Sequence, residues 1–164
     1  RPMSDVIMTE RPKLTAPKTE NRLVRFVYRQ DIPQEFLVEK NGEGGIVRYS
    51  NAELTACDLV QNASALGGHS AVATILRELL ESVDFHGAAE GVFNRCSSAV
   101  IQRLGYLVEE VLGDSVQGGV IYDEWRKMPV PRRTILLNAD RRTENAPISE
   151  RWKIVVNEIV EEDD

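Results

Sequence analysis

The stretch that most constrains the fold is residues 46–80, IVRYSNAELTACDLVQNASALGGHSAVATILRELL. It opens with strand-like residues, and Ser50 and Glu53 then fit a capping box. In that motif the serine oxygen accepts an N–H of the first helical turn, and the glutamate reaches back to the serine N–H. The stretch therefore predicts a strand end followed by a helix that runs from residue 51 or 52 to about residue 61.

A turn of small residues containing Gly67 and Gly68 follows this first helix. Beyond the turn, apolar residues recur at the three- and four-residue spacing of a single helical face. The residues of this stripe are Val72, Ile75, Leu76, Leu79 and Val83. The spacing predicts a second helix of about sixteen residues with Arg77 on its opposite face.

The fifty residues before the first helix predict β structure. Residues 5–9 alternate weakly, and residues 22–29 (RLVRFVYR) are rich in β-branched and aromatic side chains. Two further short strands, at 36–40 and 45–49, flank the sequence Asn-Gly-Glu-Gly. A turn of this composition between two strands favours a hairpin.

More helices are expected after residue 80. A short one is predicted at 85–93, and a longer one capped by Ser97 or Ser98 and stopped by Gly113. Gly105 lies inside the longer helix, where a glycine costs roughly 1 kcal/mol relative to alanine, and a close backbone contact would explain it. A last helix is expected over 114–126, with Trp125 anchoring its end.

Strands at 133–137 and 152–156 complete the pattern, and 138–149 is expected to be a polar, mobile loop. Strands, then four to five helices, then strands indicate an α+β fold rather than alternating βαβ units. We expect the last strands to return to the N-terminal sheet. The prediction is one domain over 1–164, with a loosely ordered start (1–20) and an acidic tail (158–164).

Composition agrees with one soluble domain in a reducing compartment. Apolar residues make up 42% of the 164, enough for a single core. Neither a membrane-length apolar run nor a signal peptide is evident, and Cys57 and Cys96 form no CxxC pair. We therefore expect a cytoplasmic protein. The start at Arg1 without methionine, in residues that already resemble a strand, predicts a piece of a longer chain.

The formal net charge is −6, yet two groups of basic residues stand out. Such groups can contact the phosphate backbone of DNA. The alternative is that they are the solvated faces of strands and loops, which is the commoner meaning of such charges. The candidate contacts are Arg11, Lys13, Arg22, Arg25 and Arg29 in the first group, and Arg126, Lys127, Arg132 and Arg133 in the second.

Catalytic patterns are sparse. His69 follows Gly67 and Gly68 at a helix start, where amide groups can bind an anion. An enzyme site there is one hypothesis; the favoured one is that the glycines serve turn geometry and that His69 is a surface or capping residue. A buried carboxylate facing Arg103 is a further option, with a structural ion pair as its default meaning. We predict no enzyme, no metal and no cofactor.

Four runs in order resemble the C-terminal domain of AbiEi-type antitoxins. They are VRYSNAELTACDLV at 47–60 with the double glycine at 67–68, VATILREL at 72–79, QRLGYL at 102–107 and RWKIVVN at 151–157. Together they cover most of the chain, from about residue 22 to residue 162. The motif residues that we carry over as scaffold markers are Ser50, Glu53, Thr55, Asp58, Gly67, Gly68, Arg103, Gly105, Trp152 and Asn157.

The resemblance implies an antitoxin of a bacterial type IV toxin-antitoxin system linked to abortive infection by phage. Such an antitoxin counters a nucleotidyltransferase-like toxin without forming a stable complex with it. A winged helix at its N-terminus, absent from the residues here, represses the operon through promoter DNA. The rival hypothesis is a DNA-backbone-contacting or dimerisation module of a winged-helix regulator.

Overall fold

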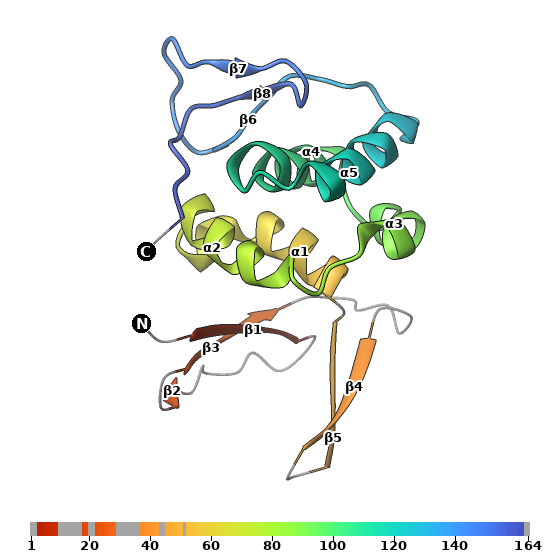
Figure 1. Cartoon of the computed structure of the whole chain (residues 1–164). Helices are drawn as coiled ribbons and strands as arrows, with labels where there is room; N and C mark the ends of the chain where they lie inside the picture. The colour runs from red at the N-terminus through yellow and green to blue at the C-terminus, as the bar shows by residue number, and fades with distance from the viewer. Residues whose placement is uncertain are drawn as a thin grey trace. The chain divides into compact units, whose positions relative to one another are not determined.

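The structure is a computed structural model of the whole chain. It describes residues 3–9, 18–19, 22–28, 37–42, 45–50 and 52–162, with side chains over 52–86 and 91–162. The chain forms two compact units, Arg1–Thr55 and Ala56–Asp164, and each is described by itself (Figure 1). In the parts that the structure describes, no helix has the length and apolar character needed to cross a membrane.

The first unit consists of strands. β1 (Met3–Thr9) pairs in parallel with β3 (Arg22–Tyr28), and the two-residue β2 (Lys18–Thr19) pairs antiparallel with the other edge of β3. β4 (Leu37–Gly42) and β5 (Gly45–Ser50) form a separate antiparallel pair in which Gly42 lies opposite Gly45. The β-branched and aromatic residues of β3 are types that strands favour.

The helices begin with α1 (Ala52–Gln61), in agreement with the predicted bounds. A 3₁₀ turn, η2 (Ala63–Leu66), leads to α2 (His69–Leu79), and α3 (Phe85–Phe93) has the bounds predicted for it. α2 is shorter than expected because the chain turns after Leu79, so Val83 is buried from a loop rather than from the helix.

The next helix divides into two segments, α4 (Ser98–Tyr106) and a π-helical segment, η3 (Leu107–Val111). Ser97 caps α4 by accepting from the backbone N–H of Val100 at 3.2 Å, as predicted. Gly113 adopts a φ of +75° just after the helix, the left-handed stop that its position indicates. α5 (Ser115–Lys127) then starts with Asp114 as its cap.

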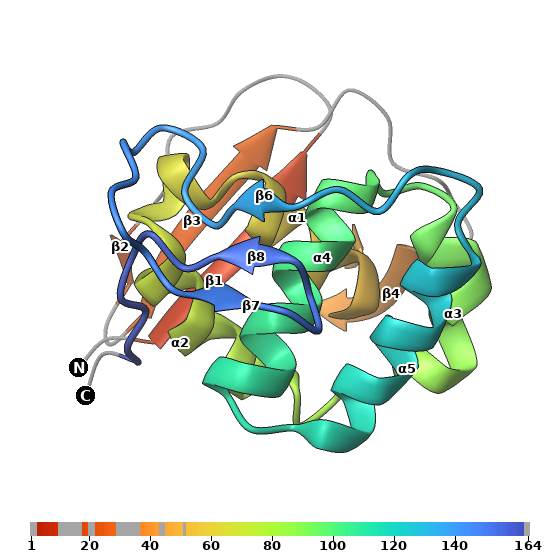
Figure 2. The same ribbon diagram turned by 90° about the horizontal axis from the view of Figure 1, so that it is seen from above.

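The C-terminal strands form a small sheet of their own. β8 (Ile154–Val155) lies between β6 (Ile135–Leu136), which is parallel to it, and β7 (Ile148–Ser149), which is antiparallel. The expectation that these strands return to the N-terminal sheet is therefore wrong. Trp152 and Ile154 are both fully buried, and β8 contacts α4; Figure 2 shows β8 beside that helix. β7 also lies within the stretch predicted to be a loop.

Two tryptophans form the centre of the second unit. The rings of Trp125 and Trp152 stack with centroids 5.8 Å apart, and Tyr122 meets Trp152 edge-on at 5.4 Å. Gly105 lies beneath this group: a Cβ there would be 2.1 Å from Cη2 of Trp152. The close neighbour expected at Gly105 is thus present, but it is an indole ring and not a backbone.

Candidate functional site

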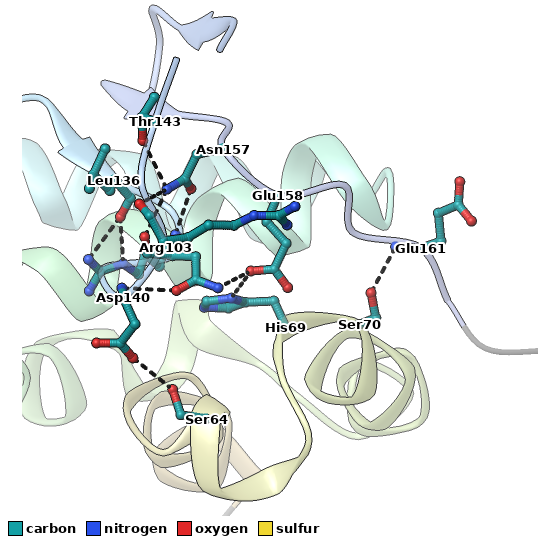
Figure 3. Close-up of polar contacts among 12 residues, drawn as sticks. Ser64, His69, Ser70, Arg103, Leu136, Asp140, Thr143, Asn157, Glu158 and Glu161 are labelled. Atoms are coloured by element: carbon teal, nitrogen blue, oxygen red, sulfur yellow. Dashed lines mark hydrogen bonds and ion pairs between the residues drawn. The ribbon is translucent and has the colours of Figure 1, made fainter. Parts of the chain in front are cut away.

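Polar side chains gather at the start of α2, where the segments that follow β6 and β8 approach it (Figure 3). Gly67 and Gly68 both have left-handed φ values, +100° and +97°, and so turn the chain from η2 into α2. The Gly68 N–H also donates to the Ala63 carbonyl at 2.7 Å. The double glycine therefore places His69 as the first residue of α2.

His69 is buried, with only 8% of its surface exposed, so the prediction of a surface or capping histidine is wrong. Its Nδ1 lies 3.2 Å from Oε2 of Glu158, and the two side chains point toward one another in Figure 3. The same carboxylate oxygen accepts a hydrogen bond from Nδ2 of Asn138 at 2.9 Å. Glu158 covers the imidazole because the chain after β8 passes over the start of α2.

Asn157 fixes the loop that follows β6. Its Oδ1 accepts the Asn138 N–H at 2.9 Å, and its Nδ2 donates to the carbonyls of Asn138 and Arg141 and to Oγ1 of Thr143. One amide therefore engages residues 138, 141 and 143. The scaffold role expected for Asn157 stays a prediction.

A groove of about 610 Å³ lies beside this loop. Its lining residues are Arg141, Arg142, Thr143, Glu144, Ala146, Val156, Asn157, Glu158 and Ile159. Histidine beside a carboxylate is an arrangement used in acid–base chemistry. Here, however, no hydroxyl or thiol of a described residue hydrogen-bonds the other ring nitrogen of His69, and the carboxylate is also held by Asn138.

Among the residues whose side chains are described, no carboxylate forms an ion pair with Arg103 on α4. Its Nε and Nη2 both donate to the main-chain carbonyl of Leu136, at 3.1 and 2.9 Å, so the ion pair considered for it is wrong. Burial lowers the pKa of this guanidinium. Arg103 thus ties β6 to α4.

Glu109, six residues further on in η3, pairs instead with Arg151 and accepts from Nε1 of Trp152 at 3.1 Å. The hydrogen bonds with Glu109 raise the pKa of Arg151, whose guanidinium lies 3.9 Å from the Tyr122 ring centroid. The two contacts of Glu109 join residues 42 and 43 positions apart. No local pattern in the sequence predicts them.

The remaining predicted residues divide by location. Thr55 and Asp58 are buried on α1, and Arg126, Lys127, Arg132 and Arg133 are exposed around the end of α5. Only the backbone is described for Arg22 and Arg25 in β3 and for Ser50 in β5. The predicted capping contacts between Ser50 and Glu53 therefore depend on a side chain outside the described ones. Arg11, Lys13 and Arg29 lie outside the described residues altogether.

The fold and the site define a mixed α+β domain whose described polar residues mainly fix turns, loops and the chain end. Comparison with protein families matches residues 3–110 to the model of the AbiEi antitoxin C-terminal domain. The chain belongs to this family, which confirms the resemblance noted in the sequence. The match ends before Trp152 and Asn157, whose use as family markers stays a prediction.

The other two comparisons gave no match. No curated protein and no solved structure is similar to the chain at the threshold applied.

Proposed function

We propose that the chain is the antitoxin part of a bacterial type IV toxin-antitoxin system and counteracts a nucleotidyltransferase-like toxin. The observation that carries this proposal is the family match over residues 3–110, two thirds of the chain. The matched segment includes α1, the turn at Gly67 and Gly68, and α2. We further propose that neutralisation is non-enzymatic and proceeds without a stable complex with the toxin.

The contacts of the motif residues support a scaffold role for them. Thr55 and Asp58 are buried, Gly68 makes a left-handed turn, and Gly105 accommodates a tryptophan ring. Each of these features sets backbone shape or packing. The surface that acts on the toxin is therefore more reasonably sought among exposed residues.

Survival of bacteria that express the toxin tests this function. The full-length protein is co-expressed with the toxin encoded beside it, and colonies are counted against cells that carry the toxin with an inert protein. We expect the antitoxin to restore the colony count. Equal killing with and without the protein, while it is present in soluble form, would contradict the proposal.

We also propose that the full-length protein acts in the cytoplasm and represses its own promoter, with the basic residues of the first unit assisting. Arg22 and Arg25 are three positions apart on β3 and are in register with Met3 and Val6 of β1. Arg11, Lys13 and Arg29 complete that proposed phosphate-contacting group. The rival hypothesis, a DNA-contacting or dimerisation module, shares these residues and differs in lacking toxin neutralisation.

A further inference from the structure

The groove beside the loop that follows β6 combines charged and apolar side chains. Its volume of about 610 Å³ falls in the range of small-molecule sites, roughly 300–1,000 Å³. All of its lining residues belong to the second unit. The lining includes three charged and three apolar side chains: Arg141, Arg142, Glu144, Ala146, Val156 and Ile159. A ligand with a charged end and an apolar body matches this composition.

Arg141 and Arg142 bring two adjacent positive charges to the groove. Both are exposed, and within the described part of the chain neither side chain forms an ion pair or a hydrogen bond. The hydrogen bonds of Arg141 come from its main chain, whose carbonyl accepts from Nδ2 of Asn157 at 3.2 Å. Two guanidinium groups are therefore available to an anion, and the planar fork of arginine matches the oxygens of a phosphate.

Hydrogen bonds hold the backbone on both sides of the groove. The Asn157 amide that engages the Arg141 carbonyl also donates to Oγ1 of Thr143, a contact drawn in Figure 3. Nearer the other end of the loop, the N–H of Val156 donates to the carbonyl of Pro147 at 2.8 Å. Because this backbone is fixed before a ligand arrives, less ordering entropy opposes binding.

The apolar part of the lining includes Ile159, of which 81% of the surface is exposed. This is the most exposed large apolar side chain in the described part of the chain. Ala146 and Val156, which also line the groove, are half-buried. A flat apolar body placed on these side chains removes apolar surface from water, which favours binding.

We infer that the groove binds a nucleoside monophosphate. Its phosphate carries about two negative charges at pH 7, which match the guanidinium groups of Arg141 and Arg142. The base covers Ile159 and its neighbours, and Glu144 accepts a hydrogen bond from a hydroxyl or amino group of the nucleoside. Each part of the ligand thus has a partner in the groove.

The carboxylates of the groove disfavour a longer polyanion. Glu144 and Glu158 both line it, and like charges brought together lower affinity. A single phosphate at one end of the groove leaves the carboxylates to the uncharged nucleoside. The inference therefore concerns a free nucleotide, and it depends neither on toxin neutralisation nor on promoter binding.

Glu158 connects the groove to the start of α2. It lines the groove, and its Oε2 lies 3.2 Å from Nδ1 of the buried His69. A ligand in the groove therefore changes the surroundings of this imidazole. The other histidine of the chain, His86, is exposed and does not line the groove.

Isothermal titration calorimetry of the full chain tests the inference. The probes are the four ribonucleoside 5′-monophosphates, the same nucleosides without phosphate, and inorganic phosphate. We expect saturable binding of at least one monophosphate and much weaker binding of its nucleoside and of phosphate. In a parallel NMR titration, the ring-proton signals of His69 should shift while those of His86 stay in place.

Two variants locate the phosphate. Arg142→Gln should weaken binding of the monophosphate about tenfold, because a charge-assisted hydrogen bond is lost, and the double variant with Arg141→Gln should weaken it further. The matched control is Arg133→Gln, which removes an exposed arginine that lies outside the groove and whose side chain makes no described hydrogen bond. Its affinity should equal that of the wild type.

Several results would overturn the inference. They are the absence of saturable binding by every monophosphate, equal affinity of the double variant and the wild type, and inorganic phosphate binding as tightly as the nucleotide. Tighter binding of a single-stranded oligonucleotide than of its monophosphate, or a shift confined to His86, would also contradict it. Should the double variant melt at a lower temperature than the wild type, Arg142→Gln alone decides the outcome. Colony counts measure the antitoxin role separately.

Discussion

At the scale of single residues, Gly105 shows how a position that weakens a helix is kept for packing. It stands in α4 directly against the indole of Trp152, which is fully buried and stacked on Trp125. The ring has no room to move aside. A side chain of any size at residue 105 must therefore displace the tryptophan or the helix itself.

Replacing Gly105 with alanine should destabilise the protein by about 1–3 kcal/mol, despite alanine's better helix propensity, because the added methyl overpacks the core. Gly119→Ala on α5 is the control, since a Cβ there meets nothing within 4 Å. That change should be neutral or stabilise by roughly 0.5–1 kcal/mol. Urea denaturation of both variants measures the two effects; equal stability of Gly105→Ala and wild type would contradict the packing argument.

At the scale of elements, the described part of the acidic tail runs along α2. Glu158 meets His69, the N–H of Glu161 donates to Oγ of Ser70 at 3.2 Å, and Glu162 pairs with Arg77. From residue 69 to 77 an α-helix rises about 12 Å, close to the reach of an extended segment from 158 to 162. The segment therefore follows α2 as an extended strap.

This strap should loosen in acid. Hydrogen bonding with Arg77 lowers the pKa of Glu162, and hydrogen bonding with Glu162 raises the pKa of Arg77. A carboxyl whose pKa is lowered in the folded state stabilises the protein at pH values above its ordinary pKa of about 4.3. This stabilisation is lost as the pH falls through the pKa of the folded state. Arg77 stays charged throughout this range.

Urea denaturation of the wild type and of Glu162→Gln at several pH values measures how the stability that Glu162 contributes depends on pH. The wild type should be slightly more stable at neutral pH, and the difference should shrink toward zero below about pH 4. Because both side chains are substantially exposed, the difference should also shrink in high salt. A difference that grows as the pH falls would contradict the assignment.

The π-helical segment η3 is the element that the apolar pattern did not reveal. Its stripe of buried residues continues from α4, with Leu104, Leu107 and Val108 all fully buried. The wider turn places Glu109 against Arg151 and against Gly118, where a Cβ would come within 2.5 Å of the Glu109 Cβ. Leu104, Leu107 and Val108 keep the three- and four-residue spacing of an α-helix, so periodicity does not detect the π-helical segment.

At the scale of the whole molecule, the family match and the packed core cover different parts of the chain. The match ends at residue 110, yet the core of the second unit draws on later residues. These are Ile121, Trp125, Leu137, Trp152 and Ile154, each at most 2% exposed. Without these later residues, the apolar side of α4 that they cover would be exposed to water.

A chain cut after residue 110 should therefore lose cooperative unfolding, because apolar burial supplies most of the driving force for folding. A chain cut after residue 160 is the control, since it removes only Glu161, Glu162 and the last two residues. Thermal melting followed by circular dichroism distinguishes them. A sharp transition in the shorter chain would show that residues 111–164 are dispensable for folding.

The sequence determined the elements whose signals are local. Neighbours within a few residues fix the backbone conformation directly at the Ser97 cap and at the Gly113 stop. They also set the bounds of α1 and α3. The three runs that lie within residues 3–110 likewise pointed to the family that the comparison then showed. The mixed α+β class followed from element order.

Only the tertiary structure decided which distant groups meet. His69 is buried by Glu158, Arg103 faces a carbonyl of Leu136, and the last strands pair with each other instead of returning to the first sheet. The contact of His69 with Glu158 joins residues 89 positions apart, and that of Arg103 with Leu136 joins residues 33 positions apart. Trp125 and Trp152 likewise stack on each other in the second unit, and no local spacing encodes that contact. The stretch at 46–80 thus determined its own helices and turn, and the fold determined what covers them.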